Sequence, residues 1–268
     1  MKLFQIYYDE SSRRSLDPDF LPLNNRESER GDWFEYWPIR QTLLNHHFDD
    51  EEYVGFFSPR FKEKTGLSGS EVIGRMGEAK GDVVSFSPFL HEGILFFNSF
   101  YQAEAAHPGC MRLSQEFLDA AGVGINLRLL VQDQTRTIFS NYFVAKYRFW
   151  KKWHQLTTQL FELCERQEGV LVDRLTENTR HRGQESIYQM KIFIMERLVS
   201  IVLEMEEINT EKGISYATGS HYGTGTIFNN LMILEALKGQ YIKTGDKIFM
   251  GLYTNFRQEF MGAVGQRL

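Results

Sequence analysis

The chain has 268 residues, of which 42% are hydrophobic and 24% are charged, a balance typical of a globular protein with a sizeable core. Its formal net charge is −5 and no stretch is strongly basic, which argues against duplex nucleic acid as a partner, because such binding needs clustered cations. The two cysteines, Cys110 and Cys164, form neither a CxxC pair nor a metal-ligand spacing, as expected in a reducing compartment.

The sequence predicts neither a signal peptide nor a membrane-spanning helix. The first nine residues turn acidic too soon for a signal peptide. The longest apolar stretch, residues 192–203, is interrupted by Glu196 and Arg197 and is too short to span a membrane. We therefore expect a cytoplasmic protein.

Strand and helix patterns alternate along the chain. In order, they predict a strand at 3–8, a loop at 17–31, a helix at 33–44, a strand at 53–57, a short helix capped by Ser70 and a strand at 82–86. A helix at 114–121, a strand at 137–144, helices at 148–165, 187–207 and 227–237, and a strand at 247–253 follow. This alternation predicts an α/β fold with a mostly parallel central sheet flanked by helices, in a single domain over 1–268.

Familiar catalytic motifs are missing from the sequence. The Gly-rich segment 219–225 lacks the Lys-Ser/Thr ending of a P-loop, and we interpret it as a turn or a mobile substrate loop. No GxGxxG follows the first strand, no GxSxG elbow is present, and His46 and His47 do not have metal-ligand spacing.

Polar and basic residues instead follow three predicted strands. In open α/β sheets, ligands bind outside the carboxyl ends of the strands. Arg60 and Lys62 have the charge that a diphosphate needs, although such residues are also common as solvated loop charges. The residues at these strand ends are Tyr7, Tyr8, Ser58, Arg60, Lys62, Lys64, Ser85 and Ser87.

Two further segments carry candidate acids. Residues 98–109 place Asn98, Gln102, Glu104 and His107 among aromatic residues, where Glu104 and His107 are candidates for a base or for contacts with sugar hydroxyls. An exposed helix charge is the equal alternative for Glu104. Glu196 interrupts an apolar helix, so it is either functional or paired with a base such as Arg197.

Four segments together resemble GT-A-type glycosyltransferases of bacterial capsule and O-antigen clusters. They are Glu-Tyr-Trp-Pro-Ile-Arg at 35–40, the strand and basic loop at 53–64, Asn-Tyr-Phe-Val-Ala-Lys at 141–146 with Phe149 and Trp150, and Phe-Ile-Met-Glu-Arg-Leu at 193–198. In order, they cover about residues 1–205.

The resemblance implies a GT-A-like single domain whose donor-binding half is roughly 1–110 and whose acceptor-side half is roughly 111–268. The donor would be a nucleotide-diphospho-sugar and the acceptor a saccharide or a lipid-linked saccharide, in surface polysaccharide synthesis. It leaves open a homo-oligomer and peripheral association with membrane-bound assembly machinery at the inner face of the membrane. By the same resemblance, Tyr7 and Tyr8 would lie near the base, Arg40, Arg60 and Lys62 near the diphosphate, and Glu196 would be the acidic base.

One departure from the family concerns the metal. GT-A enzymes usually bind Mn²⁺ or Mg²⁺ through an Asp-x-Asp, whereas the matching position here reads Ser85-Phe86-Ser87. We therefore expect basic residues to replace the metal in a direct displacement, with Glu196 or Glu104 deprotonating the acceptor. Binding of Mn²⁺ or Mg²⁺ without an Asp-x-Asp is the alternative. The alternatives are a non-catalytic sugar-binding, nucleotide-binding or assembly protein, and a nucleotide hydrolase or nucleotidyltransferase.

Overall fold

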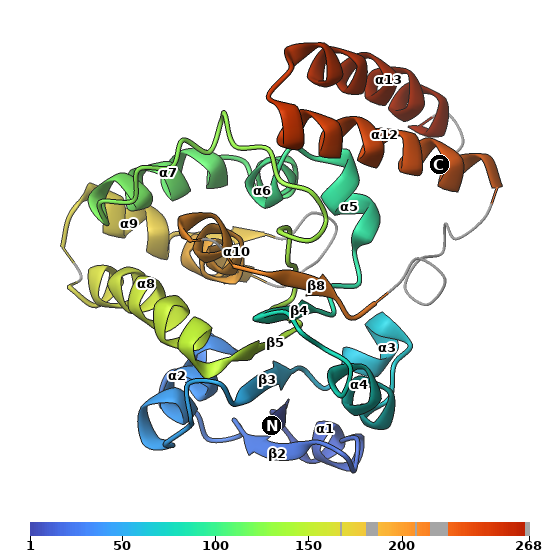
Figure 1. The fold of residues 1–268 in the computed structure, drawn as a ribbon. Coiled ribbons are helices and arrows are strands. Elements are labelled where there is room, and N and C mark those ends of the chain that lie inside the picture. The colour runs from blue at the N-terminus through green and yellow to red at the C-terminus, as the bar shows by residue number, and fades with distance from the viewer. Residues whose placement is uncertain (167, 181–186, 207, 215–224, 266–268) are drawn as a thin grey trace.

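A computed structural model describes residues 1–166, 168–180, 187–206, 208–214 and 225–265. Within these residues, a six-stranded sheet lies at the centre of the molecule, with the strand order β2-β1-β3-β5-β4-β8 (Figure 1). The strands are β1 (Lys2–Tyr7), β2 (Leu21–Asn24), β3 (Tyr53–Phe57), β4 (Val83–Ser85), β5 (Phe143–Lys146) and β8 (Thr210–Lys212).

The sheet is mixed. The pairs β1–β2, β1–β3 and β4–β8 are parallel, whereas β5 is antiparallel to both β3 and β4. Because two antiparallel pairings restore the direction, β4 runs the same way as β3. The carboxyl ends of β1, β3 and β4 therefore share one edge of the sheet with the amino end of β5. The predicted α/β class is confirmed.

Each face of the sheet has its own apolar core, because neighbouring side chains on a strand point to opposite faces. Phe4, Ile6 and Phe56 belong to the larger core, while Leu3 and Phe57 belong to the smaller one on the other face. Helices α2 (Tyr36–Asn45), α7 (Cys110–Ala120), α8 (Tyr147–Glu165) and α10 (Met190–Met205) contribute to the larger core, and α3 (Phe61–Thr65) and α4 (Gly69–Met76) to the smaller one.

Helix α8 buries the apolar face that its sequence predicts. The predicted helix at 148–165 is confirmed, and the apolar positions at intervals of three or four residues are all buried: Phe149, Trp153, Leu156, Leu160 and Cys164. Between them, Trp150 stacks on Phe143 with 4.5 Å between ring centroids and donates a hydrogen bond from Nε1 to the Val54 carbonyl at 2.9 Å. This helix is thereby fixed to the sheet.

The other elements lie around this centre. They are α1 (Glu10–Arg14), the 3-10 helix η1 (Gly31–Trp33), α5 (Leu90–Leu95), α6 (Ser99–Ala106), α9 (Val170–Thr176) and the two-stranded sheet of β6 (Asn178–Arg180) and β7 (Ile187–Gln189). None of the described helices is both long enough and apolar enough to cross a bilayer.

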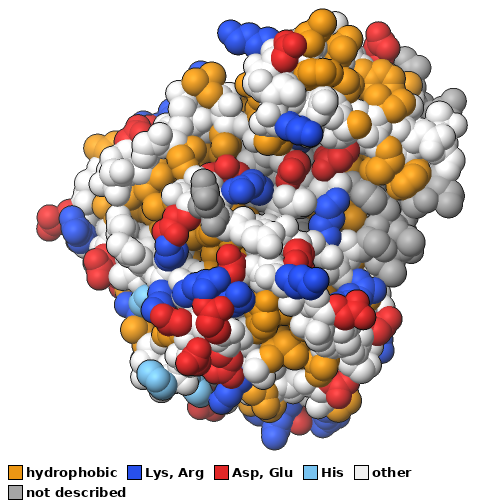
Figure 2. Space-filling view, in the orientation of Figure 1, with side chains coloured by type: hydrophobic (Ala, Val, Ile, Leu, Met, Phe, Trp, Pro, Cys, Tyr) orange, Lys and Arg blue, Asp and Glu red, His pale blue; other side chains and the backbone are white. Residues whose placement is uncertain are grey.

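The C-terminal hairpin consists of α12 (Gly225–Thr244) and α13 (Lys247–Gly265). It forms a separate small core with Ile94, and hydrophobic side chains gather over this part of the surface (Figure 2). The strand predicted at 247–253 is wrong. Asp246 Oδ1 accepts the Ile248 amide at 3.0 Å, as a helix cap does, and the spacing of Tyr253 and Phe260 directs both rings inward.

Other local predictions need correction. Residues 21–24 are a strand rather than loop, and Pro22 is tolerated because β2 is an edge strand. The strand predicted at 137–144 begins only at Phe143, after two residues with positive φ, Ser140 and Asn141. Helix α4 is capped by Ser68 rather than Ser70. Of the Gly-rich segment, residues 219–224 lie outside the described residues.

The sheet centre has no room for a methyl group at Gly55. A Cβ there would lie 2.8 Å from Val144 Cγ2 and 3.0 Å from Leu3 Cδ2. We expect Gly55→Ala to lower the free energy of unfolding by about 1–3 kcal/mol through overpacking. Gly74→Ala, in exposed helix with open space around it, is the control and should raise the free energy by about 0.5–1 kcal/mol. Urea unfolding of both variants checks the opposite signs, and equal signs would contradict the packing argument.

Candidate functional site

A cavity of about 690 Å³ opens at the edge of the sheet where β1 and β3 end. Tyr8 follows β1 directly, and Arg60 and Lys64 follow β3. Ser140 and Asn141 precede β5, whose amino end lies at the same edge because this strand runs antiparallel. Helix α10, the segment before α2, and helices α5 and α6 complete the walls. The cavity thus occupies the place where α/β sheets bind ligands.

Glu35, at the start of α2, is a carboxyl group of the cavity with a strongly raised pKa. Its Oε1 accepts a hydrogen bond of 3.0 Å from the Tyr8 hydroxyl. Burial raises the pKa of Glu35 to about 7, and the charge of Glu196 adds to this, while the Tyr8 hydrogen bond and the charge of Lys64 oppose it. A carboxyl group with this pKa exchanges protons readily near neutral pH.

Glu196, on α10, faces the same cavity. Its Oε1 accepts the Ser140 backbone amide at 2.7 Å, and its Oε2 lies 3.7 Å from Arg197 Nη1. Arg197 is buried and donates to the Ser99 and Phe193 carbonyls and to Gln102 Oε1. The ion pair considered from the sequence is therefore present, and it does not remove Glu196 from the cavity.

Two cations lie on the α3 side of the cavity. Lys64 Nζ donates to Ser140 Oγ at 3.1 Å and lies 5.4 Å from the centroid of the Tyr142 ring. Arg60 is exposed and pairs with Glu63 at 2.6 Å. Lys62, between them, is exposed and does not line the cavity. An anion entering from this side meets Arg60 and Lys64.

Strained backbone is concentrated around the cavity. Among the described residues, the non-glycine residues with positive φ are Phe34 (46°), Ser140 (61°) and Asn141 (51°), and all three line it. Such conformations cost about 1–3 kcal/mol each and are concentrated at functional sites. Phe34 immediately precedes Glu35, and the Ser140 amide donates to Glu196, so the strain lies beside these two carboxylates.

Gln102 and His107, predicted to bind the acceptor, do line the cavity, on the α10 side. Gln102 Oε1 accepts a hydrogen bond of 2.6 Å from Arg197 Nη2. The His107 ring stacks on the Phe193 ring, with 3.5 Å between their centroids. The third acceptor candidate, Asn98, is completely buried; it caps α6 and donates to the Leu127 and Leu130 carbonyls.

Glu104 is not brought to the cavity. Its two carboxylate oxygens accept the backbone amides of Gly109 and Met111 at 2.9 and 2.8 Å, at the beginning of α7. Carboxylates at this end of a helix stabilise it through the exposed amides and the helix dipole. The structure thus gives Glu104 a capping role.

Several predicted donor-binding residues support the cavity wall or lie away from it. Tyr7 lies beneath Arg13, and the Arg40 guanidinium lies 4.9 Å from the Phe161 ring centroid. Ser58 is hydrogen-bonded to the Tyr142 hydroxyl. Ser87 Oγ accepts the amide of Phe139, a cavity residue, at 3.0 Å.

The tripeptide Ser85-Phe86-Ser87 does not fit a divalent cation. Ser85 Oγ accepts the Ser87 amide at 3.3 Å, so both hydroxyls are engaged within the protein. The Phe86 ring lies against Gly213. Mn²⁺ and Mg²⁺ prefer carboxylate oxygens, which this tripeptide lacks.

Sequence reasoning gave no role to Glu35. A signal was nevertheless present, because Glu35 lies within Trp33-Phe34-Glu35-Tyr36-Trp37, and a charge flanked by aromatic rings on both sides is a candidate for desolvation.

No protein-family model matches the chain, and no curated protein or solved structure is significantly similar to it.

Proposed function

We propose that this protein is a glycosyltransferase that moves a sugar from a nucleotide-diphospho-sugar to a hydroxyl of a saccharide acceptor. The observation that carries the proposal is the convergence of two cations and two carboxylates, from separate segments, on one cavity at the carboxyl edge of the sheet: Arg60, Lys64, Glu35 and Glu196. A GT-A-like arrangement of the chain is part of the same proposal.

The chemistry needs a proton acceptor and a place for a departing anion. Glu35 accepts the proton of the acceptor hydroxyl, whose oxygen attacks the anomeric carbon. The bond from that carbon to the phosphate oxygen breaks, and its electron pair leaves with the nucleoside diphosphate. Arg60 and Lys64 stabilise the negative charge that develops on the diphosphate. Glu196, held by the Ser140 amide, is placed to accept a hydrogen bond from the acceptor sugar.

The aromatic lining supports a sugar or nucleotide ligand. Phe34, Phe89 and Tyr188 line the cavity with partly exposed rings, and rings of this kind stack on nucleobases and on the apolar faces of sugars. A cavity of about 690 Å³ lies within the range found for sites of small-molecule ligands.

Binding of nucleoside diphosphates tests the donor side. We expect Lys64→Met to weaken binding about 10- to 100-fold in calorimetric titrations with uridine, guanosine and thymidine diphosphates, because a charge-assisted contact contributes about 1.5–3 kcal/mol. Lys62→Met, a neighbouring exposed lysine outside the cavity, is the matched control and should bind as the wild type does. Equal losses in both variants would count against the cavity as the donor site.

An assay of nucleotide-sugar turnover is a second test of the proposed function. Incubation with the corresponding nucleotide-sugars, with and without saccharide acceptors, should release the nucleoside diphosphate faster when an acceptor is present. Release of a nucleoside monophosphate or of pyrophosphate would replace the proposal with a hydrolase or nucleotidyltransferase. Binding without any turnover would favour the non-catalytic alternative.

A further inference from the structure

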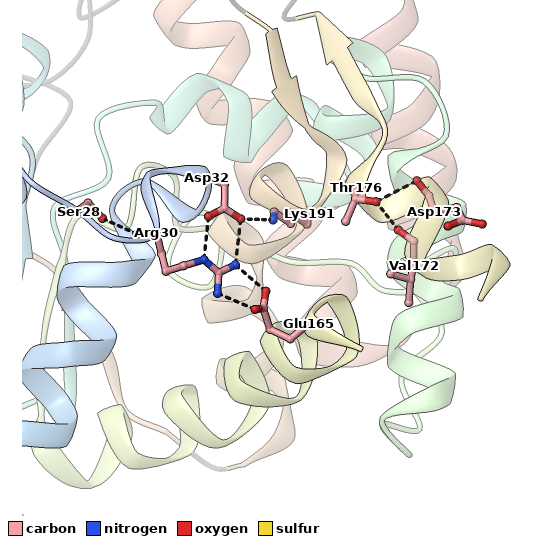
Figure 3. A network of polar contacts seen from close by, with 8 residues as sticks. All are labelled: Ser28, Arg30, Asp32, Glu165, Val172, Asp173, Thr176 and Lys191. Carbon is pink, nitrogen blue, oxygen red and sulfur yellow. Dashed lines mark hydrogen bonds and ion pairs between the residues drawn. The ribbon is translucent and has the colours of Figure 1, made fainter. Parts of the chain in front are cut away.

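Four charged side chains form a continuous chain of ion pairs in the order Glu165, Arg30, Asp32 and Lys191, which we call the ion network (Figure 3). The Arg30 guanidinium lies between two carboxylates, 3.0 and 3.1 Å from the oxygens of Asp32 and 2.6 Å from both oxygens of Glu165. Lys191 Nζ donates to Asp32 Oδ2 at 2.7 Å. Two positive and two negative groups therefore balance within the network.

The network joins three segments that are far apart in the sequence. Asp32 belongs to η1, Glu165 is the last residue of α8, and Lys191 lies in the first turn of α10. Asp32 is three residues before Glu35, and Lys191 is five residues before Glu196. The network thus links the segments that carry Glu35 and Glu196, two of the carboxylates of the cavity.

Trp33 connects the network to the cavity wall. Its ring is completely buried, with Lys191 Nζ 4.1 Å from its centroid on one side, and it also lines the cavity. Hydrogen bonds from Arg30 and Lys191 lower the pKa of Asp32, against the opposing effect of burial, so its carboxylate stays ionised at neutral pH. The ion pair between Asp32 and Lys191 is therefore present at neutral pH.

The segment that the network holds is strained. Phe34, between Trp33 and Glu35, has φ 46° and ψ −124°, a conformation that a phenylalanine adopts only when its surroundings impose it. On the other side, the Phe34 ring meets Tyr188 at 5.3 Å. Lys191 is buried, whereas the Asp32 side chain is 40% exposed. Ion pairs with a buried member contribute little net stability, but they fix a unique arrangement in some proteins. An arrangement of this kind would keep the Phe34 backbone in its strained state.

We propose that Asp32 and Lys191 are positioning residues, which hold the strained turn at Phe34 and thereby direct the Glu35 carboxylate into the cavity toward Tyr8. This inference rests on the proposed function for the role of Glu35. The geometry itself is independent of that function, because the network fixes where Glu35 lies whatever the ligand is.

Replacing both charges together gives the clearest test. The variant Asp32→Asn with Lys191→Met leaves Arg30 paired with Glu165 and leaves no buried charge unpaired, so folding should survive; circular dichroism checks this. We expect kcat to fall about 10- to 100-fold through misplacement of the base, with the donor KM changed less than about threefold. The single variant Lys191→Arg, with Asp32 intact, retains the charge and should lose less kcat than the double variant.

A readout without turnover separates this inference from the proposed function. Carbon-13 spectra of glutamate-labelled protein, with the Glu35 signal assigned through Glu35→Gln, should show the Glu35 titration near pH 7 in the wild type. In the double variant its midpoint should fall toward that of an ordinary glutamate, because the side chain gains access to solvent. Arg112→Gln, which breaks an exposed pair with Glu116 on α7, is the control and should leave the midpoint unchanged.

The outcomes are distinguishable. An unchanged Glu35 titration in the folded double variant overturns the positioning role, whatever the activity. A shifted titration in a protein whose wild type transfers no sugar upholds the positioning role and overturns the proposed function.

Discussion

Glu35→Gln is expected to lower kcat for glycosyl transfer about 10²- to 10⁴-fold, the usual contribution of a general base. Glutamine has the same shape and can still accept the hydrogen bond of the Tyr8 hydroxyl, which is 3.0 Å from Oε1 in the wild type, but it takes up no proton at neutral pH. Steady-state kinetics with saturating donor measure the loss. The donor KM should change little, because the proposal assigns the diphosphate contacts to Arg60 and Lys64, which line the cavity.

The same variant should become more stable relative to the wild type as the pH rises. Folding raises the pKa of Glu35 from 4.5 to about 7, because the folded state disfavours the ionised carboxylate. The protonated Glu35 therefore contributes its full share of the free energy of unfolding below pH 4.5. This contribution is lost as the pH rises through 7. Glutamine has no such loss. Between pH 5 and pH 8 we expect the difference in free energy of unfolding to move by about 2 kcal/mol in favour of Glu35→Gln, measured by urea unfolding.

Two other Glu→Gln variants serve as comparisons. Glu104→Gln makes the same chemical change outside the cavity, at the cap of α7, and should retain full kcat while losing about 1 kcal/mol of stability. Glu196→Gln, inside the cavity, should raise the acceptor KM. If Glu35→Gln retains full activity and Glu196→Gln does not, then Glu196 is the base instead. If both retain activity, the acid–base mechanism is wrong.

Lys238→Met is expected to cause the largest loss of stability, about 2–4 kcal/mol. Lys238 is completely buried on α12, and its Nζ donates to the carbonyls of Gly93, Phe96 and Gln132 at 2.5, 2.6 and 2.8 Å. Burial lowers the pKa of Lys238 to about 8, so the ammonium is still charged at pH 7 and has three protons for three acceptors. Methionine leaves all three carbonyls without this donor.

The loss should be localised in the C-terminal hairpin. Lys238, Tyr253 and Arg257 all donate to carbonyls at the end of α5, which are the groups that a helix leaves without intrahelical partners. Hydrogen exchange should therefore show faster exchange in α12 and α13 of Lys238→Met than in α8. Lys243→Met, at an exposed position of the same helix, should change stability by less than about 0.5 kcal/mol. Uniformly faster exchange would contradict a role of Lys238 in attaching the hairpin.

Local sequence patterns determined several features of this protein. The strand at 53–57 and the helix at 148–165 follow from apolar runs and from the spacing of Phe149, Trp153 and Leu156. Tyr8 and Arg60, which follow parallel strands and were therefore predicted to lie at one edge of the sheet, line the same cavity. These inferences succeeded because side-chain periodicity and strand direction are properties of a segment and its immediate neighbours.

Tertiary structure alone decided which acids share the cavity. Glu104 lies in a polar and aromatic segment as Glu35 does, yet the approach of Gly109 and Met111 engages one in a cap, while the strained turn at Phe34 directs the other toward Tyr8. The direction of β5 and the helical state of α13 likewise depend on partners distant in the sequence. The physical reason is that desolvation and hydrogen bonding, which set a group's pKa and role, are supplied by segments that only folding brings together.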